Sequence, residues 1–493
     1  MTYILALDQG TSSSKATIFD RNGLALGRGQ VEYDNIFPRD GWVEQVPEVL
    51  WDTSLAAARE ALKVSGLRGL DLTCIGIANQ RETALVWDRQ TGESVYNAII
   101  WQDRRTADRC EELTTHEIAE VINSITGLLI DPYFSATKVQ WILENIAGVR
   151  ERAESGDLCF GTVDTYLIWK LTKGASHVTD ATNASRTLLY DIDSLMWSDQ
   201  LLDFFGVPHS MLPTVHDSSA LFGQVSGEYF GKEIPITGVA GDQQAALIGQ
   251  ACFSPGMTKI TYGTGCFAMV NTGTNRLKSK HNLLTTIAYQ LAGQPIYALE
   301  GSIFSAGVAI KWLRDNLGLI KTVEETEVIA QKTDDHVKGV VVVPAFTGLG
   351  APYWAPDSRA LIAGLTLDTT TNDIVTATLQ SIGFQTADLI EAILADEAIV
   401  SELRVDGGMA SNSWFCQFLS DILSLPVERP GDTETTILGA AMLAGLGSGM
   451  ISELDEIAER WSLDSSYRPS IAIAKRDSML GSWRSAVKRA LLP

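Results

Sequence analysis

Cysteine and histidine are scarce in this chain: six of each occur among 493 residues, and neither type is clustered. Because no Cys-x-x-Cys pair occurs, the sequence predicts neither a zinc site nor a disulfide framework, and a reducing cytoplasm fits best. No run of about 18 apolar residues exists, which argues against a transmembrane helix and stable membrane insertion. The N-terminal apolar run has no basic region and ends at Asp8, so we expect a first strand there rather than a signal peptide.

Positive charge is also scarce. The chain holds 38 lysines and arginines against 60 acidic residues, a formal net charge of −22. No basic stripe is present, so nucleic acid and anionic membrane surfaces are excluded as expected partners. Any phosphate ligand must therefore be bound by nearby hydrogen-bond donors and a metal ion, and not by the electrostatic field of the protein as a whole.

Apolar residues are plentiful, at 45% of the chain, and are spread evenly enough for sizeable cores. At roughly 150 residues per domain, the length allows two large or three ordinary domains. Strand and helix patterns alternate along the chain, which predicts an α/β fold with mixed sheets. We place the domain boundary after Gly249, giving domains 1–249 and 250–493.

Two matching phrases lie far apart in the chain. Residues 4–15 and 259–270 each read as an apolar strand, a Gly-Thr turn and a returning strand. Such a turn directs backbone N–H groups and hydroxyls at one spot, as phosphate sites require. Two copies predict two related domains that bind one polyphosphate.

The first turn carries side chains suited to a metal-bound phosphate. Asp8 ends the strand, and a carboxylate in that place suits Mg²⁺, which takes few protein ligands. Thr11, Ser12 and Ser13 offer hydroxyls, and Lys15 offers a positive charge. An ordinary Ser/Thr turn is the alternative, and the second copy of the phrase favours the phosphate site.

Four further candidate residues lie next to predicted elements. Arg81 and Glu82 end a buried strand predicted over 74–79, and form either a solvated ion pair or a donor and acceptor for a hydroxylated substrate. Trp101 ends an apolar strand and is either a core residue or a wall for the carbons of a small polyol. Tyr133 precedes a helix predicted over 137–146 and offers a hydroxyl.

The chemistry-bearing residues continue in the second half of the sequence. Asp242 starts a helix after a strand, where it is either an N-cap or a general base for a substrate hydroxyl. Gly407 and Gly408 end another strand, and either form a simple turn or let a flat ligand approach the backbone. We also expect a buried strand over 340–344 and a long helix over 374–394.

Taken in order, these phrases closely resemble those of the glycerol kinases, within the carbohydrate-kinase family of the actin-like ATPase superfamily. The resemblance covers essentially the whole chain, and Arg81-Glu82 with Trp101-Gln102 point to glycerol rather than a sugar. The segments that carry it are residues 8–11, 41–45, 79–83, 101–105, 131–135, 241–244, 262–267, 348–354 and 406–408.

The resemblance implies two actin-like (ribonuclease H-like) α/β domains, with mixed sheets flanked by helices and the active site in the interdomain cleft. The N-terminal domain is expected to bind glycerol and the C-terminal domain the nucleotide. The implied reaction is ATP-dependent phosphorylation of glycerol to sn-glycerol 3-phosphate, the first step of glycerol catabolism, with ATP/ADP and Mg²⁺ as cofactors. A homodimer or homotetramer is also implied.

The resemblance assigns a role to each candidate. Asp242 is the implied base and Asp8 acts through Mg²⁺. Glycerol is bound by Arg81, Glu82, Trp101, Tyr133, Asp242, Gln243 and Phe267. The nucleotide is bound by Thr11, Ser12, Ser13, Lys15, Thr264, Gly307, Lys311, Gly408 and Asn412. The sequence departs from the commonest family pattern at Ser12, Lys15 and Lys311, where threonine, arginine and glutamine are usual, so nucleotide affinity is the property most affected.

Three rival functions are weighed against this one. A kinase for another polyol or ketose needs a wider pocket than Trp101 and Phe267 indicate. A catalytically silent polyol sensor does not need both Asp8 and Asp242, which are retained. A filament-forming actin-like protein needs neither the charged pair nor the aromatic walls.

Two controls known in similar kinases are expected to be absent. Some members bind fructose 1,6-bisphosphate at a Gly-Gly-Thr-Arg loop, and here Glu233 stands where that arginine would be. A carboxylate at that place repels phosphate. Other members carry a histidine that a sugar-transport phosphocarrier phosphorylates, and here Glu228 replaces it.

Overall fold

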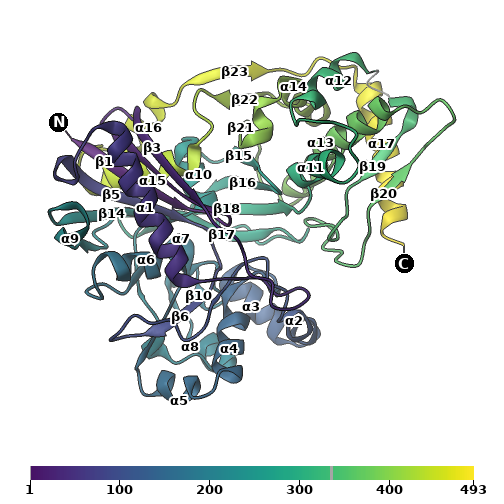
Figure 1. Cartoon of the computed structure of the whole chain (residues 1–493). Helices are drawn as coiled ribbons and strands as arrows, with labels where there is room; N and C mark the ends of the chain where they lie inside the picture. Colours follow the sequence, from purple (N-terminus) through teal and green to yellow (C-terminus); the bar gives the residue numbers. More distant parts are fainter. Residues whose placement is uncertain (1, 334–336, 493) are drawn as a thin grey trace. The chain divides into compact units, whose positions relative to one another are not determined.

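Two mixed β-sheets, each flanked by helices, organise the computed structural model, which describes residues 2–333 and 337–492 (Figure 1). The α/β class expected from the sequence is confirmed. One unit comprises residues 1–253, 285–297 and 435–461, and the other comprises residues 254–284, 298–434 and 462–493. The units are therefore interleaved along the chain, while the division into residues 1–249 and 250–493 stays a prediction.

The first unit is built on a six-stranded sheet with the order β13-β14-β5-β1-β2-β3. Strand β1 pairs antiparallel with β2 and parallel with β5, and β5 pairs parallel with β14. The bounds are β1 (Tyr3–Gln9), β2 (Ser13–Asp20), β3 (Ala25–Glu32), β5 (Leu72–Asn79), β13 (Gly223–Val225) and β14 (Ile234–Gly241). The predicted buried strand over 74–79 is thus β5.

The second unit repeats this arrangement with the order β18-β16-β15-β21-β22-β23. In the strand order β17 follows β18, although residues 285–297 of these two strands are assigned to the first unit. Strand β15 pairs antiparallel with β16 and parallel with β21, and β21 pairs parallel with β22. The bounds are β15 (Met257–Tyr262), β16 (Cys266–Gly273), β17 (Leu284–Leu291), β18 (Gln294–Ile303), β21 (Glu402–Asp406), β22 (Val427–Pro430) and β23 (Leu463–Tyr467).

Both predicted hairpins are present, β1–β2 and β15–β16, and each occupies the same place in its sheet. The register also brings polar strand ends together. Gln9 lies opposite Asn79, which lies opposite Gly241, so β1, β5 and β14 end at one edge. Because ligands bind at the carboxyl ends of parallel strands, this edge is where a site is expected.

Helices of the first unit pack by small residues. Helix α1 (Pro47–Ser65) buries Leu50, Ala57 and Ala61 and lies along β3 (Figure 1). Helix α10 (Asp242–Gly249) packs on α15 (Thr435–Gly447). A Cβ atom on Gly439 would lie 1.8 Å from the Ala245 carbonyl oxygen, so only glycine permits this approach.

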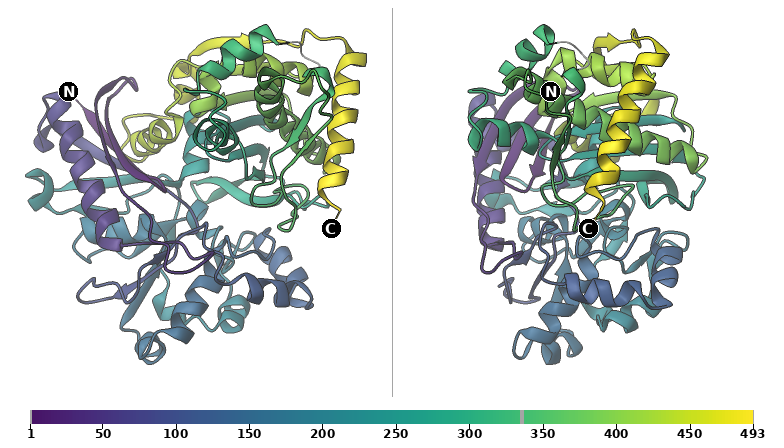
Figure 2. Two further views of the ribbon diagram at one scale, coloured as in Figure 1. Left: turned by 45° about the vertical axis from the view of Figure 1, so that its right-hand side comes forward. Right: turned by 90° about the vertical axis from the view of Figure 1, so that its right-hand side faces the viewer.

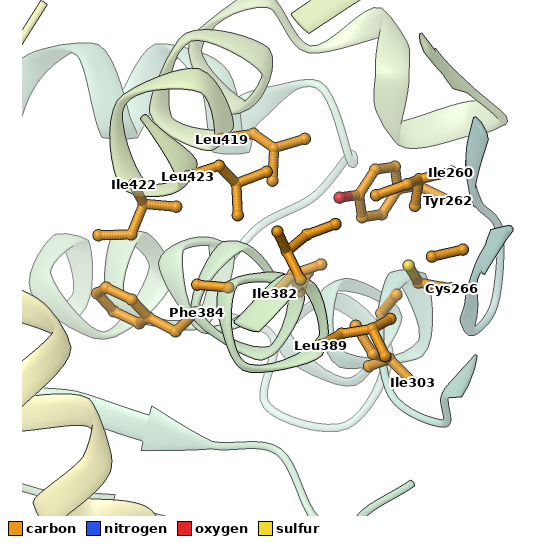
Figure 3. Close-up of a cluster of buried hydrophobic side chains, with 14 of the residues drawn as sticks. Ile260, Tyr262, Cys266, Ile303, Ile382, Phe384, Leu389, Leu419, Ile422 and Leu423 are labelled. Atoms are coloured by element: carbon orange, nitrogen blue, oxygen red, sulfur yellow. The ribbon is translucent and has the colours of Figure 1, made fainter. Parts of the chain in front are cut away.

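The core of the second unit surrounds the long helix predicted over 374–394, which is α13 (Thr371–Ala395). Figure 3 shows side chains from α13 and α14 (Ser413–Leu423) facing Ile260, Tyr262 and Cys266 of the β15–β16 hairpin. Helix α17 (Ile473–Ala490), yellow in Figure 2, adds Trp483, which stacks on Phe384. This packing anchors the base of the second hairpin.

Shorter elements complete both units. In the first unit they are β4 (Glu44–Gln45), β6 (Leu85–Asp88), β7 (Ala98–Ile99), β8 (Leu158–Gly161), β9 (Val178–Asp180), β10 (Tyr190–Asp191), β11 (Met196–Trp197), β12 (Thr214–His216), α2 (Ala107–Thr114), α3 (Ile118–Thr126), α4 (Ser135–Asn145), α5 (Val149–Glu154), α6 (Val163–Leu171), α7 (Ala181–Ala184), α8 (Asp199–Phe205), α9 (Gly227–Phe230) and α16 (Leu454–Arg460). In the second unit they are β19 (Val341–Val343), β20 (Leu361–Ala363), α11 (Gly307–Asp315) and α12 (Glu325–Lys332).

All six cysteines are free and buried. Burial raises the pKa of the Cys110 thiol to about 12 and of the Cys159 thiol to about 11, so both are held as thiols.

Within residues 2–333 and 337–492, no helix has the length and apolar character needed to cross a membrane.

Candidate active site

The turn between β1 and β2 is short and fixed. The Gly10 N–H donates to the Ser13 carbonyl at 3.0 Å, which closes the turn, and Asp8 lies half-buried at the end of β1. Thr11 and Ser13 are also half-buried, and Ser12 is exposed. Lys15 lies on β2 directly opposite Asp8. The predicted phosphate-site side chains of this turn are therefore gathered at one hairpin end.

Buried glutamines support this turn from the protein side. Gln80 Nε2 donates to Gln9 Oε1 at 3.1 Å, to the Gly10 carbonyl at 3.2 Å and to Gln45 Oε1 at 2.8 Å. Gln45 Nε2 in turn donates to the Thr11 carbonyl at 2.7 Å. Because these bonds occupy the turn's carbonyls, its shape is set before any ligand binds.

Arg81 and Glu82 are buried, with 2% and 1% of their surface exposed, so the interpretation as a solvated ion pair is wrong. Arg81 Nε lies 3.3 Å from Asp242 Oδ1 and 3.6 Å from Glu82 Oε1. Its guanidinium also donates to Gln244 Oε1 and to the Tyr133 hydroxyl, both at 3.2 Å. One arginine therefore joins three of the predicted substrate-binding residues.

The Glu82 carboxylate has a second cationic partner. Arg186, which is fully buried, donates from Nε to Glu82 Oε1 at 2.7 Å. Its guanidinium also lies over the Tyr133 ring, 5.7 Å from the centroid. Glu82 has a φ of 61°, a left-handed conformation that non-glycine residues seldom adopt. Such a conformation persists only where surrounding contacts hold it.

Trp101 and Tyr133 form an aromatic pair with centroids 5.7 Å apart in an edge-on arrangement. Trp101 is half-buried, so it is not a core tryptophan. The strand expected to end there is only two residues long, β7, because the chain turns at residues 101–102. Trp101 Nε1 donates to Thr11 Oγ1 at 2.9 Å, which joins the aromatic pair to the turn.

Asp242 is the first residue of α10, and Gly241 occupies the N-cap, so the N-cap interpretation of Asp242 is wrong by one position. Asp242 Oδ1 accepts from the Gln243 N–H at 2.7 Å. The Asp242 side chain is 29% exposed, whereas Gln243 is buried. The carboxylate is thus held by Arg81 and the helix start while remaining open on one side.

The second unit gathers its predicted residues around the β15–β16 turn. The Gly263 carbonyl accepts from the Gly307 N–H at 3.0 Å, and the Thr264 carbonyl accepts from the Val308 N–H at 3.1 Å. The start of α11 is thereby fastened to the turn. Thr264 is exposed and Phe267 is half-buried. Lys311 lies on α11 and is exposed, so its charge reaches solvent.

The glycine pair after β21 lies beside the same turn. Gly407 has a φ of +83°, and a Cβ atom there would lie 2.5 Å from the Tyr262 carbonyl oxygen. A Cβ atom on Gly408 meets nothing within 4 Å. Asn412 caps α14 by accepting from the Phe415 N–H at 2.9 Å. The pair therefore combines a required turn with open space above Gly408.

Metal-ligating groups are sparse at these turns. Across the part of the chain that the structure describes, no group of three or more His, Cys, Asp or Glu residues is placed to hold a metal ion. Asp8 contributes one carboxylate beside a hydroxyl-bearing turn. This donor set fits Mg²⁺ carried by a nucleotide, since that ion uses few protein carboxylates and keeps water and phosphate ligands.

Sequence reasoning missed several residues of this arrangement. Arg186, Gln244 and Lys138 each contact a predicted site residue, and Gln80 donates to the Gly10 carbonyl of the first turn. Gln244 adjoins Gln243 and Gln80 adjoins Arg81, and this adjacency to predicted site residues is a signal available in the sequence. Buried charges such as Arg186 carry no periodic signature, because their partners are far away in the chain.

Comparison with known proteins identifies relatives along the whole chain. Residues 3–249 match the N-terminal domain model of the FGGY family of carbohydrate kinases, and residues 258–448 match the C-terminal domain model. The chain is 53% identical over 489 residues to the glycerol kinase of Marinomonas sp., covering 99% of this chain and 98% of that one. It is 54% identical over 487 residues to glycerol kinase 1 of Pseudomonas aeruginosa, covering 99% and 98%.

A solved structure agrees with these sequence relatives. The crystal structure of Plasmodium falciparum glycerol kinase with ADP superposes with a TM-score of 0.93 at 37% identity. That match covers all of this chain and 99% of the other. The fold and the sequence phrases therefore point to the same family.

Proposed function

This chain belongs to the glycerol kinases of the FGGY family of carbohydrate kinases, and we propose that it transfers the γ-phosphoryl group of ATP to glycerol, giving sn-glycerol 3-phosphate and ADP as the first step of glycerol catabolism. The observation that carries this proposal is the buried pair Arg81 and Glu82 beside the half-open Asp242 carboxylate. A small molecule with adjacent hydroxyls matches such a set of one cation and two carboxylates.

Glycerol is bound by hydrogen bonds on one side and apolar contact on the other. The Glu82 carboxylate accepts from substrate hydroxyls, and Arg81 donates to them. Tyr133, Gln243 and the Asp242 carboxylate complete the polar contacts, and Trp101 and Phe267 flank the carbons. Because Arg81 and Glu82 are already desolvated and paired, a molecule that lacks a hydroxyl leaves one of them unsatisfied.

Asp242 acts as the general base. The hydroxyl oxygen of glycerol attacks the γ-phosphorus while the bond from that phosphorus to the β-bridging oxygen breaks, and the hydroxyl proton passes to the Asp242 carboxylate. ADP leaves with the bridging oxygen. Arg81 Nε lies 3.3 Å from Asp242 Oδ1 and holds the carboxylate in place.

The nucleotide is bound by the two hairpin turns and the glycine pair. Thr11, Ser12, Ser13 and Lys15 of the first turn contact the phosphates, with Thr264 of the second. Gly307, Lys311, Gly408 and Asn412 contact the rest of the nucleotide. Asp8 would hold Mg²⁺, which neutralises charge on the transferred phosphoryl group when bound. Support comes from the open space above Gly408 and the fixed shape of both turns.

Assembly and control follow from the same resemblance. We assign the chain to a reducing cytoplasm as a homodimer or homotetramer, and expect control neither by fructose 1,6-bisphosphate nor by a phosphocarrier. At the position where other members carry the phosphorylated histidine, the Glu228 carboxylate lies 2.5 Å from Lys173 Nζ, and both side chains are exposed. The acidic Glu233 stands nearby in sequence. Inhibition of the purified chain by fructose 1,6-bisphosphate would overturn this expectation.

A coupled assay of ADP release tests the function. The purified chain, ATP and Mg²⁺ are combined with glycerol, propane-1,2-diol, erythritol or D-xylulose, with a no-acceptor control for ATP hydrolysis. We expect the highest kcat/KM with glycerol. Preference for erythritol or xylulose would favour the rival function, a kinase for another polyol or ketose. If no acceptor increased ADP release, the result would favour the catalytically silent polyol sensor instead.

A further inference from the structure

Lys138 is a fully buried lysine with no role in the mechanism above. It lies in the first turn of α4 and reaches back toward the segment that precedes the helix. Its ammonium donates to the Glu82 carbonyl oxygen at 3.1 Å and to the Tyr133 carbonyl oxygen at 2.6 Å. Two residues of the glycerol site are therefore joined through one side chain.

The placement of this lysine is costly, which argues for a specific purpose. Burial removes water from the ammonium and lowers the pKa of Lys138 to about 7, although the nearby carboxylates of Glu82, Asp103 and Asp131 oppose that shift. An apolar residue of similar length would fill the same space without this penalty. What it would lack is a donor for the two carbonyls.

The Glu82 carbonyl has a second donor on the same helix. Ser135, the first residue of α4, donates from Oγ to that oxygen at 3.0 Å. Glu82 has a φ of 61°, which is unfavourable for a residue with a Cβ atom. The start of α4 therefore holds the Glu82 backbone in its left-handed conformation, while Arg186 and Arg81 hold its carboxylate.

We propose that Lys138 is a positioning residue for glycerol, fixing the Glu82 carboxylate and the Tyr133 hydroxyl at the spacing that the substrate requires. This rests on the proposed function. The hydrogen bonds of Lys138 go to carbonyls of two proposed glycerol-binding residues, so we expect its effect to fall on glycerol and not on ATP or on proton transfer. Ser135 supports the same carbonyl of Glu82 without reaching Tyr133.

The test compares Lys138→Met with Thr137→Val in the full-length enzyme. Methionine keeps the volume and removes both hydrogen bonds. Thr137 is the preceding residue of α4, is buried and hydrogen-bonds Thr106 Oγ1 at 2.9 Å, so Thr137→Val controls for general damage to the helix. Thermal unfolding of each variant establishes that it is folded.

We expect Lys138→Met to raise the KM for glycerol about ten-fold or more, with the KM for ATP within about two-fold of wild type. Thr137→Val should change neither KM. A merely structural role would lower the active fraction, and so the apparent kcat, while leaving both KM values unchanged. An unchanged glycerol KM in folded Lys138→Met overturns the proposal.

If Lys138→Met does not fold, Ser135→Ala decides the question. It removes one of the two donors to the Glu82 carbonyl, and we expect a smaller rise in glycerol KM, about three-fold, with ATP unaffected. No rise in that variant overturns the proposal. Failure of the proposed function looks different, because wild-type protein would then show no glycerol-dependent ADP release at all.

Discussion

Trp101 Nε1 donates a hydrogen bond to the hydroxyl of Thr11 at 2.9 Å, so the aromatic wall beside Tyr133 is joined to the turn of the first hairpin. An indole N–H is a donor only, so the Thr11 hydroxyl accepts here and its own proton points to another acceptor. A phosphate oxygen at the turn is such an acceptor. We therefore expect this contact to link occupancy of the proposed glycerol site with occupancy of the proposed phosphate site.

Trp101→Phe tests this link. Phenylalanine keeps an apolar wall but removes the N–H, and loss of one hydrogen bond of about 0.5–1.5 kcal/mol predicts a rise in the KM for ATP of roughly two- to ten-fold. Thr11→Val and the double variant complete a mutant cycle. The effects of the two single substitutions on the KM for ATP should not be additive in the double variant. Strict additivity would show that the contact does not link the sites.

Glu82→Gln tests the glycerol site itself. The change keeps the shape but removes the charge that pairs with Arg186 and Arg81, and it weakens acceptance from substrate hydroxyls. A desolvation effect of about 1–3 kcal/mol predicts a rise in glycerol KM of roughly five- to 150-fold, larger than any rise for ATP. If the ATP KM rose instead, Glu82 would belong to the phosphate site.

The adjacent glycines Gly407 and Gly408 give opposite predictions. Gly407→Ala places a Cβ atom 2.5 Å from the Tyr262 carbonyl at a positive φ, so the free energy of unfolding should fall by about 1–2 kcal/mol or more. Gly408→Ala meets no atom within 4 Å, so the protein should remain stable while the KM for ATP rises. Chemical denaturation and steady-state kinetics of both variants separate the two effects.

Unchanged ATP affinity in Gly408→Ala would remove Gly408 from the nucleotide site. Equal loss of stability in both variants would mean that the space above Gly408 is not open in solution.

Asp388 in α13 gives a pH prediction for stability. Burial raises the pKa of this carboxyl to about 6, despite hydrogen bonds from Trp483 Nε1 and the Tyr353 hydroxyl. Because the folded-state pKa lies above the unfolded value, the folded state binds the extra proton. The free energy of unfolding contributed by Asp388 therefore falls as pH rises from about 4 to about 6, by at most about 3 kcal/mol.

Asp388→Asn should remove that part of the pH dependence, since its amide oxygen still accepts from both donors without ionising. Urea denaturation at pH 4.5 and pH 7.5 measures this as the wild-type minus variant difference in unfolding free energy, which should be more positive at the lower pH. An identical difference at both values would contradict the prediction.

Much of this site is predictable because its residues follow strands directly. The apolar run at 74–79 and the two Gly-Thr turns are enough to place Arg81, Glu82, Asp8 and Thr264 at strand ends. The local sequence pattern is sufficient to predict these positions, because in an α/β protein a short apolar run that ends in polar residues usually forms a buried strand followed by a loop.

Long-range contacts are not predictable from local pattern. Burial of Lys138 depends on hydrogen bonds to the carbonyl oxygens of Glu82 and Tyr133. Nothing in the sequence of residues 137–146 indicates the contact with Glu82. The left-handed φ of Glu82 has no sequence signal either, because a glycine or asparagine is the usual marker. The return of α15 to the first unit likewise depends on packing of Gly439 against Ala245, far away in the chain.

Asp242→Asn is the most direct measurement of the central claim, that this carboxylate is the base for phosphoryl transfer to glycerol. Asparagine keeps the oxygen that accepts from Gln243 N–H but has no basic lone pair at neutral pH. Single-turnover formation of sn-glycerol 3-phosphate, with glycerol binding and folding verified separately, should slow by about 10²–10⁴-fold. A rate near that of wild type in folded, glycerol-binding Asp242→Asn would contradict the account.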